Sequence, residues 1–316
     1  MTGALDHSAL LSIVVLTWNN FVDTAECLES LEQLTYPRYN IILVDNGSTD
    51  GSIERLRSTF PEVEIIKNDR NLGYAAGNNV GIKHALSNGA EYVLILNNDT
   101  IVDRNLAAEL LSTSRACNNL GILGCANYYY DSRERIQFSG GIIDWRTGDV
   151  IDTTRHKINA GQFEALREVD TVAGSCLFIP ASVIKALGNF DERYFLTFEE
   201  SDFCCRAKKG GYRVYTCMNA MIWHKVSLTG KAQKKGINIL KYYAVRNRFL
   251  FLYKHSPRRF LPISLSYHLA RTLLYIAREL RKGNLLQAKV LLLGLIAGIV
   301  REVGRGVLSK PLEQLS

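Results

Sequence analysis

The sequence predicts an α/β protein with a doubly wound, mostly parallel sheet flanked by helices, followed by a helical and basic C-terminal extension. Two observations support this fold class. Through the first hundred residues, apolar β-prone segments alternate with segments of helical periodicity. Each of the first four β-prone segments also ends in polar residues. Ligands of such sheets bind outside the carboxyl ends of the strands, so these polar ends predict a shared binding edge.

The predicted elements follow one another in a regular order. Strands are expected where the sequence is continuously apolar or β-branched, at 11–16, 40–45, 63–67 and 92–96. Helices are expected where apolar residues recur at helical spacing, at 22–31, from about 52, at 75–87 and from about 105. Further strand-like stretches occur at 121–126, 135–144 and 169–179, with a helix signal at 180–187. We interpret 1–230 as one domain of two halves, 1–120 and 121–230, and 231–316 as a helical region.

Charge is distributed unevenly along the 316 residues. The whole chain carries a net charge of +7, but residues 231–316 hold 17 Lys and Arg against three Glu, a local balance of +14. Residues 1–230 therefore carry −7. A basic segment predicts an anionic partner, either nucleic acid or a lipid surface. Leu and Ile accompany the charge here rather than aromatic stacking platforms, so we expect no nucleic-acid binding.

The cysteines and the N-terminus bear on the compartment. Seven cysteines form no CxxC pair and no zinc-like spacing, which predicts a reducing compartment. The first fifteen residues lack a basic region ahead of an apolar core, so no signal peptide is expected. The sequence thus favours the cytosol.

The first chemical motif is VDNGSTDGS at 44–52, a polar turn after a buried strand. Asp45 can accept a hydrogen bond from a ligand, and Gly47 and Gly51 let the backbone approach one closely. A calcium loop starting at Asn46 is excluded because Arg57 stands at its twelfth position. An Asx turn that caps the next helix is an equally good interpretation of the same residues.

The second motif is NNDT at 97–100. Asp99 offers a hard oxygen ligand, and Mg²⁺ or Mn²⁺ bound to a nucleotide needs only one or two protein carboxylates. The alternative is that Asp99 or Asp103 caps the helix that begins near Asn105.

Two later motifs add acid–base and metal-binding groups. FEESDFCCR at 198–206 places Glu199, Glu200 and Asp202 within four residues, either as a solvated helix start or with one carboxyl of raised pKa that acts as a general base. IWHK at 222–225 places His224 after apolar residues. A buried structural histidine is the common case, although imidazole also suits Mn²⁺.

Together these motifs resemble the inverting family 2 glycosyltransferases of GT-A fold, and in particular their rhamnosyltransferase-like branch. The matching blocks are VVLTWNN, VDNGSTDGS, NDRNLGYAAGNNVGI, LILNNDT, GNFDERYFLTFEESDFCCR and IWHKVS, in that order, over roughly residues 9–255. A single block is weak, but the ordered set is specific. The resemblance implies that 1–120 is the donor half of the catalytic domain and 121–230 the acceptor half.

The resemblance implies a binding site for a nucleotide-diphosphate sugar, either a dTDP- or a UDP-sugar. The residues that it places around the donor are Thr17, Asn19, Asp45, Ser48, Gly73, Asn78 and Asn98. LNND corresponds to the family's DXD motif, so Asp99 would bind Mn²⁺ or Mg²⁺, with His224 as a second ligand. Asn97 and Asn98 stand where the motif often has acids, which leaves Asp99 as its only carboxylate.

The resemblance also assigns the reacting groups. Glu200 stands where the family usually has a catalytic Asp and would be the base, with Glu199 and Asp202 as competitors. Gly174 and Ser175 would border the acceptor, a glycan or a polyprenyl-linked saccharide. The base would take the hydroxyl proton as that oxygen attacks the anomeric carbon, and one displacement inverts the configuration. The departures at Asn97, Asn98 and Glu200 motivate an alternative, a non-catalytic module that binds a nucleotide sugar or docks to membranes.

The apolar run VLLLGLIAGIV at 290–300 is too short to span a bilayer, which takes about 20 residues. Flanked by Lys289, Arg301 and Arg305, it predicts a helix lying on an anionic membrane surface. A buried helix or a dimer contact is the alternative, and the sequence permits a homo-oligomer. The expected location is cytoplasmic, peripheral on the inner face of the cell membrane.

Overall fold

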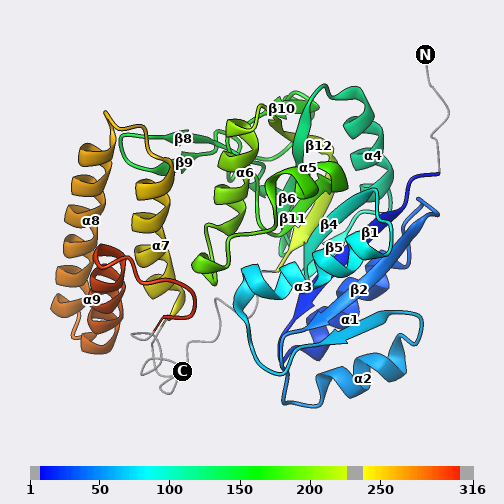
Figure 1. Cartoon of the computed structure of the whole chain (residues 1–316), viewed down its shortest axis with the longest axis horizontal. Coiled ribbons are helices and arrows are strands. Elements are labelled where there is room, and N and C mark those ends of the chain that lie inside the picture. The colour runs from blue at the N-terminus through cyan, green and yellow to red at the C-terminus, as the bar shows by residue number, and fades with distance from the viewer. Residues whose placement is uncertain (1–7, 226–237, 307–316) are drawn as a thin grey trace.

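A computed structural model describes residues 8–225 and 238–306 (Figure 1). Its main sheet has the strand order β10-β12-β6-β11-β4-β1-β2-β3, with β5 beside β12 and β7 beside β6. One half is parallel and consists of β1 (Leu11–Thr17), β2 (Tyr39–Asp45), β3 (Glu64–Lys67) and β4 (Tyr92–Asn97). The chain reverses its direction of winding between β1 and β4, which is where doubly wound sheets bind ligands.

The other half of the sheet is mixed. It contains β5 (Thr100–Val102), β6 (Leu120–Tyr129), β7 (Ser132–Phe138), β10 (Leu166–Glu168), β11 (Cys176–Pro180) and β12 (Arg213–His224). β11 lies antiparallel between β4 and β6, and β12 is parallel to β6 but antiparallel to β5. A separate hairpin joins β8 (Ile142–Asp144) to β9 (Asp149–Ile151). The predicted fold class, a mostly parallel sheet flanked by helices, is confirmed.

Helices cover both faces of the sheet, because its strands are apolar on both sides. One core packs the sheet against α1 (Phe21–Leu31), α2 (Ser52–Thr59) and α4 (Leu106–Ala116). The other core packs it against α3 (Gly73–Ser87), α5 (Ala181–Leu187) and α6 (Glu199–Lys209). Alternate residues of β1 enter the two cores, with Ile13 in the first and Val14 in the second.

The chain after the sheet forms three helices within the described ranges. They are α7 (Leu240–His255), α8 (Leu261–Arg281) and α9 (Leu285–Ile299), and they stand together at one end of the molecule, beyond α6 (Figure 1). Among the described residues, no helix is both long and apolar enough to cross a bilayer. The segment predicted as an interfacial helix lies in α9 and is half buried: Gly294 packs so closely on Tyr242 of α7 that a Cβ would lie 2.7 Å from its carbonyl oxygen.

Two strand predictions were too long. Within 135–144, β7 ends at Phe138 and β8 begins at Ile142, because the intervening Gly140 has a φ of +84°. Within 169–179, only Cys176 onward forms a strand. The residues before it form a loop that borders the cavity described below. The loop before Cys176, which borders a cavity, thus lies where apolar content alone predicts a strand.

Candidate active site

The carboxyl ends of β1 and β4 bring Thr17 and Asn98 together. Parallel register places Leu16 beside Asn97, so the next residues of both strands are neighbours. The Asn98 amide donates hydrogen bonds to the hydroxyls of Thr24 (2.8 Å) and Thr17 (3.3 Å), and these hydroxyls lie 2.8 Å apart. The sequence did not single out Thr24, because its role depends on α1 turning back over β1.

The loops after β1 and β2 are tied to each other. The Asn19 amide nitrogen donates to the Ser48 hydroxyl (2.9 Å), and the Asn19 side-chain oxygen accepts from the Thr49 amide (2.8 Å). One oxygen of Asp45, Oδ1, accepts from the Ser48 amide as in an Asx turn (2.9 Å). The other oxygen, Oδ2, is buried and has no hydrogen-bond partner within the described ranges. Such a group requires a donor, which a ligand can supply.

The predicted donor residues Gly73 and Asn78 lie at the start of α3. Gly73 has a φ of +86°, and a Cβ on it would lie 2.5 Å from Phe195, so only glycine fits here. Asn78 is fully buried, and its amide donates to the Tyr74 carbonyl (2.9 Å). Its side-chain oxygen, Oδ1, is buried and, like Asp45 Oδ2, has no hydrogen-bond partner within the described ranges.

Asp99 and His224, predicted as metal ligands, come together. β5 and β12 pair antiparallel, with His224 opposite Thr100, and this pairing places His224 Nε2 3.2 Å from Asp99 Oδ1. The other ring nitrogen, Nδ1, lies 2.8 Å from Gln137 Oε1. An amide oxygen only accepts, so Nδ1 carries a proton and Nε2 faces the carboxylate. Gln137 thereby orients the ring, as outer-shell partners of metal-binding histidines do.

The acidic segment forms the first turn of α6, where Glu199 and Glu200 are adjacent. Burial, followed by the neighbouring Glu200 charge, raises the pKa of Glu199 well above its usual range. Burial also raises the pKa of Glu200, while hydrogen bonds from Ser201 and Glu199 favour its charged form. The Ser201 hydroxyl donates to Glu200 Oε1 (2.9 Å). The two carboxyls therefore titrate as a coupled pair, in which the pKa of Glu199 is raised the more strongly.

Asp202 is not brought to the same place. Its carboxylate is fully buried and paired with three cationic or imidazole groups: Arg206 Nε (2.9 Å), Lys254 Nζ (2.6 Å) and His255 Nε2 (2.7 Å). Burial raises the pKa of this carboxyl, but these partners outweigh burial and leave it below its usual range. Asp202 therefore connects α6 to α7.

Gly174 and Ser175 lie in the loop before β11. Gly174 borders Glu200, since a Cβ at this glycine would lie 3.7 Å from the Glu200 Cγ. The Ser175 hydroxyl is buried and accepts a hydrogen bond from the Asn127 amide, and the Ser175 carbonyl accepts from the Asn97 amide nitrogen (3.0 Å). Ser175 thus holds the loop in place, and Gly174 leaves room beside the carboxylate.

Glu200 and His224 line one cavity of about 500 Å³. The other residues around it come from β6, β7, β9, the chain just after β9 and the loop before β11, and they include Tyr129, Gln137, Phe138, Val150, Arg155 and Thr171. The cavity therefore borders the predicted base and one of the two predicted metal ligands, His224. It is large enough for a small ligand.

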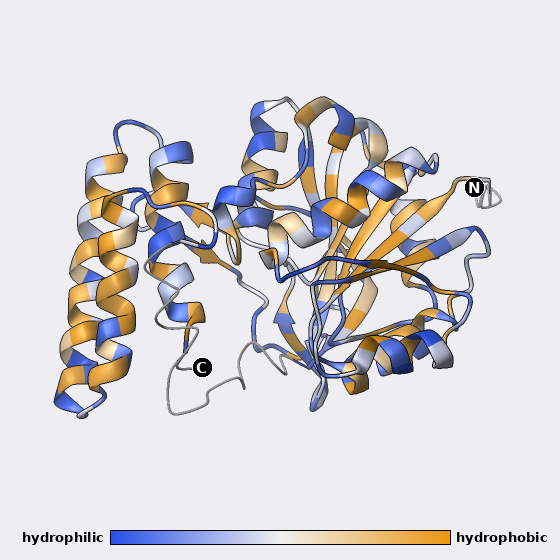
Figure 2. Cartoon of the chain, turned by 60° about the horizontal axis from the view of Figure 1, so that its bottom comes forward, coloured by the Kyte–Doolittle hydropathy of each residue, from blue (hydrophilic) through white to orange (hydrophobic). Residues whose placement is uncertain are grey.

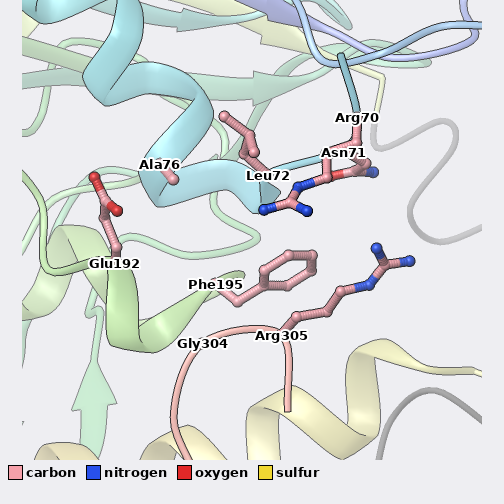
Figure 3. A pocket seen from close by; sticks show the side chains of 8 residues that line it. All are labelled: Arg70, Asn71, Leu72, Ala76, Glu192, Phe195, Gly304 and Arg305. Atoms are coloured by element: carbon pink, nitrogen blue, oxygen red, sulfur yellow. The ribbon is translucent and has the colours of Figure 1, made fainter. Parts of the chain in front are cut away.

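A second cavity, of about 430 Å³, lies where α3 begins, beside the chain after α9 (Figure 3). Figure 3 shows the Phe195 ring there, with Arg70 and Arg305 extending toward the same space. None of the predicted donor, metal or catalytic residues lines this cavity. We therefore do not assign the substrates to it.

Two residues of α7 hold the segment that leads into Glu199. The Asn247 amide donates to the carbonyls of Tyr194 (2.8 Å), Leu196 (2.7 Å) and Thr197 (2.9 Å). Arg246, fully buried, donates to the carbonyls of Arg193 and Tyr194 on this segment and of Gly304 after α9. We call Arg246 and Asn247 the α7 clasp. The sequence shows only an Arg-Asn pair in a basic helix, without a signal of this role.

The α7 clasp stabilises a segment whose backbone conformation is energetically unfavourable. Phe195, Thr197 and Phe198 all have φ between 61° and 73°, a conformation that costs non-glycine residues roughly 1–3 kcal/mol each. Replacing Asn247 by Ala should lower the free energy of unfolding by about 2–4 kcal/mol, because buried carbonyls without donors cost about 1–3 kcal/mol each. Urea unfolding would measure this, with Asn88→Ala, at the exposed end of α3, as the control. Equal free energies of unfolding for Asn247→Ala and Asn88→Ala would contradict the stabilising role of the clasp.

The fold and site together define a glycosyltransferase of GT-A fold. The structure of GalNAc-T7 with UDP, GalNAc and Mn²⁺ matches with a TM-score of 0.59 at 17% identity, over 75% of this chain and 47% of that one. This chain therefore spans about half the length of GalNAc-T7. The mannosyltransferase PcManGT of Pyrobaculum calidifontis, in complex with GDP-Man and Mn²⁺, matches with a TM-score of 0.56 at 16% identity, over 92% and 86%.

Residues 12–187 match the family model of glycosyl transferase family 2, so the chain belongs to that family. Two curated relatives are rhamnosyltransferases. The N-acetylglucosaminyl-diphospho-decaprenol L-rhamnosyltransferase of Mycobacterium tuberculosis is 26% identical over 70% of this chain and 78% of its own. The dTDP-rhamnosyl transferase RfbF of Shigella flexneri is 25% identical over 88% and 92%. The resemblance to the rhamnosyltransferase-like branch is thus confirmed, and the chain is a family 2 glycosyltransferase of glycan or polysaccharide biosynthesis.

Proposed function

We propose that this enzyme is a metal-dependent inverting glycosyltransferase. It transfers a sugar from dTDP-rhamnose or a UDP-sugar to a hydroxyl of a glycan or lipid-linked saccharide, in the synthesis of cell-surface polysaccharide. One observation carries the proposal: Glu200 and His224 line the same cavity, and His224 lies 3.2 Å from Asp99. The proposed base thus borders the same space as His224, one member of the proposed pair of metal ligands, as a transfer between two sugars requires.

The donor would lie across the ends of β1, β2 and β4. Asp45 Oδ2, buried without a partner in the part of the chain that the structure describes, would accept from an N–H of the nucleotide base. Thr17 and Asn98 would contact the ribose from the neighbouring strand ends. Asn19 and Ser48 shape the loops on either side. The names of the two rhamnosyltransferase relatives favour a deoxysugar donor, one of them a dTDP-sugar.

Asp99 and His224 fit Mn²⁺ or Mg²⁺ bound to the donor diphosphate. No group of three or more His, Cys, Asp or Glu residues in the described ranges could hold a metal. Two protein ligands suffice where phosphates and water complete the coordination. A carboxylate and an imidazole nitrogen 3.2 Å apart are suitable donors for Mn²⁺. When bound, the cation would neutralise charge on the leaving nucleoside diphosphate.

Glu200 is the base in this proposal. Its carboxyl borders the cavity, and its pKa is raised less strongly than that of Glu199, whereas Asp202 is committed to its cationic partners. Asp202 is then a positioning residue that fixes α6 on α7. Because burial raises the pKa of Glu200, we expect kcat to fall as pH drops through that raised pKa, where the protonated carboxyl no longer accepts. A pH–rate profile measures this, and an acid limb at the pKa of an ordinary glutamate would contradict it.

The acceptor would occupy the rest of the cavity. Tyr129 and Phe138 offer aromatic faces for a sugar ring, and Gly174 leaves space beside Glu200. Arg155, also on the cavity wall, suits an acceptor that carries a phosphate near its sugar. A polyprenyl diphosphate saccharide has this chemistry.

Release of nucleoside diphosphate tests the proposal. The purified protein with Mn²⁺ and a lipid-linked acceptor should release dTDP from dTDP-rhamnose or UDP from a UDP-sugar, with inversion at the anomeric carbon shown by NMR of the product. Turnover without any divalent cation would contradict the proposed metal dependence, and a retained anomeric configuration would contradict the proposed single displacement. Binding of donor without turnover of any of these substrates would indicate a non-catalytic module.

We also propose that residues 1–230 and residues 231–316 have different roles. The first part would hold both substrates, and the second would place the enzyme on the inner face of the cell membrane. Cytoplasmic nucleotide sugars and membrane-held acceptors meet there. Residues 226–237, which contain the proposed boundary, lie outside the described ranges.

A further inference from the structure

Helix α8 carries its apolar residues on the side away from the protein. Three inward residues, Ser264, His268 and Thr272, are at most 3% exposed, and the His268 imidazole lies 3.0 Å from the Val245 carbonyl of α7. In contrast, Ile263 is 54% exposed and Leu274 is 70% exposed. A helix that packs on a globular core in water normally shows the opposite pattern. The outward side of α8 therefore requires an explanation beyond folding.

The outward side of α9 extends this surface. On its inward side, Leu291 and Leu295 pack in one apolar cluster with Val245 and Phe249 of α7, while α8 covers a second side of the helix. Figure 2 shows α8 and α9 at the end of the molecule away from the sheet, coloured mostly as hydrophobic along their length. We call the outward apolar surface of both helices the α8–α9 face, and define it by its most exposed aliphatic residues: Ile263, Leu273, Leu274, Leu280, Leu285 and Ile299.

Cations surround this face at its ends. Arg258 and Arg259 precede α8, Arg278 and Arg281 end it, and Lys289 lies on α9; all five are exposed. The described residues from 238 to 306 include only two acids, and both have partners: Glu279 with Lys282 and Asn284, and Glu302 with Tyr242. The face is therefore apolar in its middle and positively charged around it.

From this pattern we infer that the α8–α9 face docks on an anionic lipid bilayer, with α8 lying in the interface. Leu and Ile side chains would enter the acyl boundary, and the arginines would meet anionic headgroups. A second copy of the chain is a poorer partner, because a two-fold contact brings identical patches together. Both ends of α8 are cationic, so such a contact would set like charges against each other whichever way the helices ran.

The inference extends the proposed membrane association, which rests on the basic charge of 231–316 and on the 290–300 segment. It moves the main contact to α8, since α9 uses its other side to pack on α7. It also supplies an orientation. α7 lies between the α8–α9 face and the segment before Glu199, because Val245 meets α8 while Arg246 and Asn247 hold that segment. The segment before Glu199 would thus lie at a fixed distance from the lipid surface.

Vesicle sedimentation tests the inference with the full chain. Wild-type protein should bind vesicles of phosphatidylcholine with about 30% phosphatidylglycerol at least about tenfold more strongly than pure phosphatidylcholine vesicles. The bound fraction should fall between about 0.1 M and 0.5 M NaCl. The double variant Ile263→Glu, Leu274→Glu should lose at least about tenfold in binding, because it introduces charge where apolar contact is required. Ile158→Glu, at a similarly exposed isoleucine remote from the helices, is the matched control and should bind like wild type.

A second variant keeps the inference falsifiable if the double variant fails to fold. Arg278→Glu, Arg281→Glu alters only exposed charges at the end of α8 and should reduce binding to anionic vesicles at least about tenfold. Wild-type binding by either variant would overturn the inference. A wild-type dimer in lipid-free solution that Ile263→Glu, Leu274→Glu dissociates would assign the face to a second copy and would also overturn it. Release of nucleoside diphosphate with a water-soluble acceptor reports the proposed transfer separately, and the surface variants should leave that turnover unchanged.

Discussion

Glu200→Gln should abolish sugar transfer while leaving donor binding nearly intact. Loss of a positioned base typically costs 10²–10⁴-fold in rate, so we expect kcat to fall by about a thousandfold. The amide of Gln keeps the shape of the side chain and its hydrogen bond to Ser201, but it cannot take a proton. Calorimetric titration with the donor and Mn²⁺ should give a Kd within about twofold of wild type, because the proposed function places the acceptor, and not the donor, beside Glu200.

Glu199→Gln is the matched control. Because the pKa of Glu199 is raised more strongly than that of Glu200, a neutral amide imitates the protonated form that Glu199 favours, and kcat should stay within about tenfold of wild type. Asp202→Asn has a different signature: it should reduce the free energy of unfolding, since Arg206, Lys254 and His255 lose their shared carboxylate. If Glu200→Gln retained turnover and Glu199→Gln abolished it, Glu199 would be the base.

Asp99→Ala should remove the dependence of donor binding on a divalent cation. The variant leaves His224 as the one remaining protein ligand of the proposed pair, so the affinity for donor in the presence of Mn²⁺ should fall by about a hundredfold. The measurement is donor titration with and without Mn²⁺. Wild type should show a large difference between the two conditions, and the variant should show almost none.

The control for Asp99→Ala is Asp103→Ala, four residues along the chain. The Asp103 carboxylate accepts a hydrogen bond from the Asn105 amide in a turn just before α4, whereas the N-cap of that helix is Asn105, which makes no side-chain capping bond. Asp103→Ala should cost about 1 kcal/mol of stability, from the lost hydrogen bond, and leave the Mn²⁺ dependence unchanged. Equal Mn²⁺ dependence in wild type and Asp99→Ala would refute the assignment of Asp99.

Local patterns predicted the fold and the polar edge of its sheet well. Strands buried on both faces must be apolar throughout, so β1, β2 and β4 were visible as runs. Their polar ends meet because parallel register aligns them, as Thr17 beside Asp45 shows. These relations depend on short-range sequence and on one rule of sheet topology, and both can be read without coordinates.

The roles of the later residues depend on contacts that sequence spacing does not encode. Asp202 looked like a competitor for the base because it lies two residues from Glu200, yet that spacing is about half a helical turn and directs its side chain toward His255, 53 residues away. The orientation of His224 depends on Gln137 from a different strand. The apolar run at 290–300 drew attention to α9, whereas the more exposed apolar surface belongs to α8, whose residues alternate with polar ones.

The α7 clasp also restricts how such enzymes can be recombined. In a chimera that takes its C-terminal helices from a relative, the residues at positions 246 and 247 would come from the relative. The segment before Glu199, to which they donate hydrogen bonds, would come from this chain. Exchanging the helices alone would therefore alter the active site along with the lipid contact. An exchange between relatives must therefore include both residues 191–198 and α7, because these two segments are hydrogen-bonded to each other.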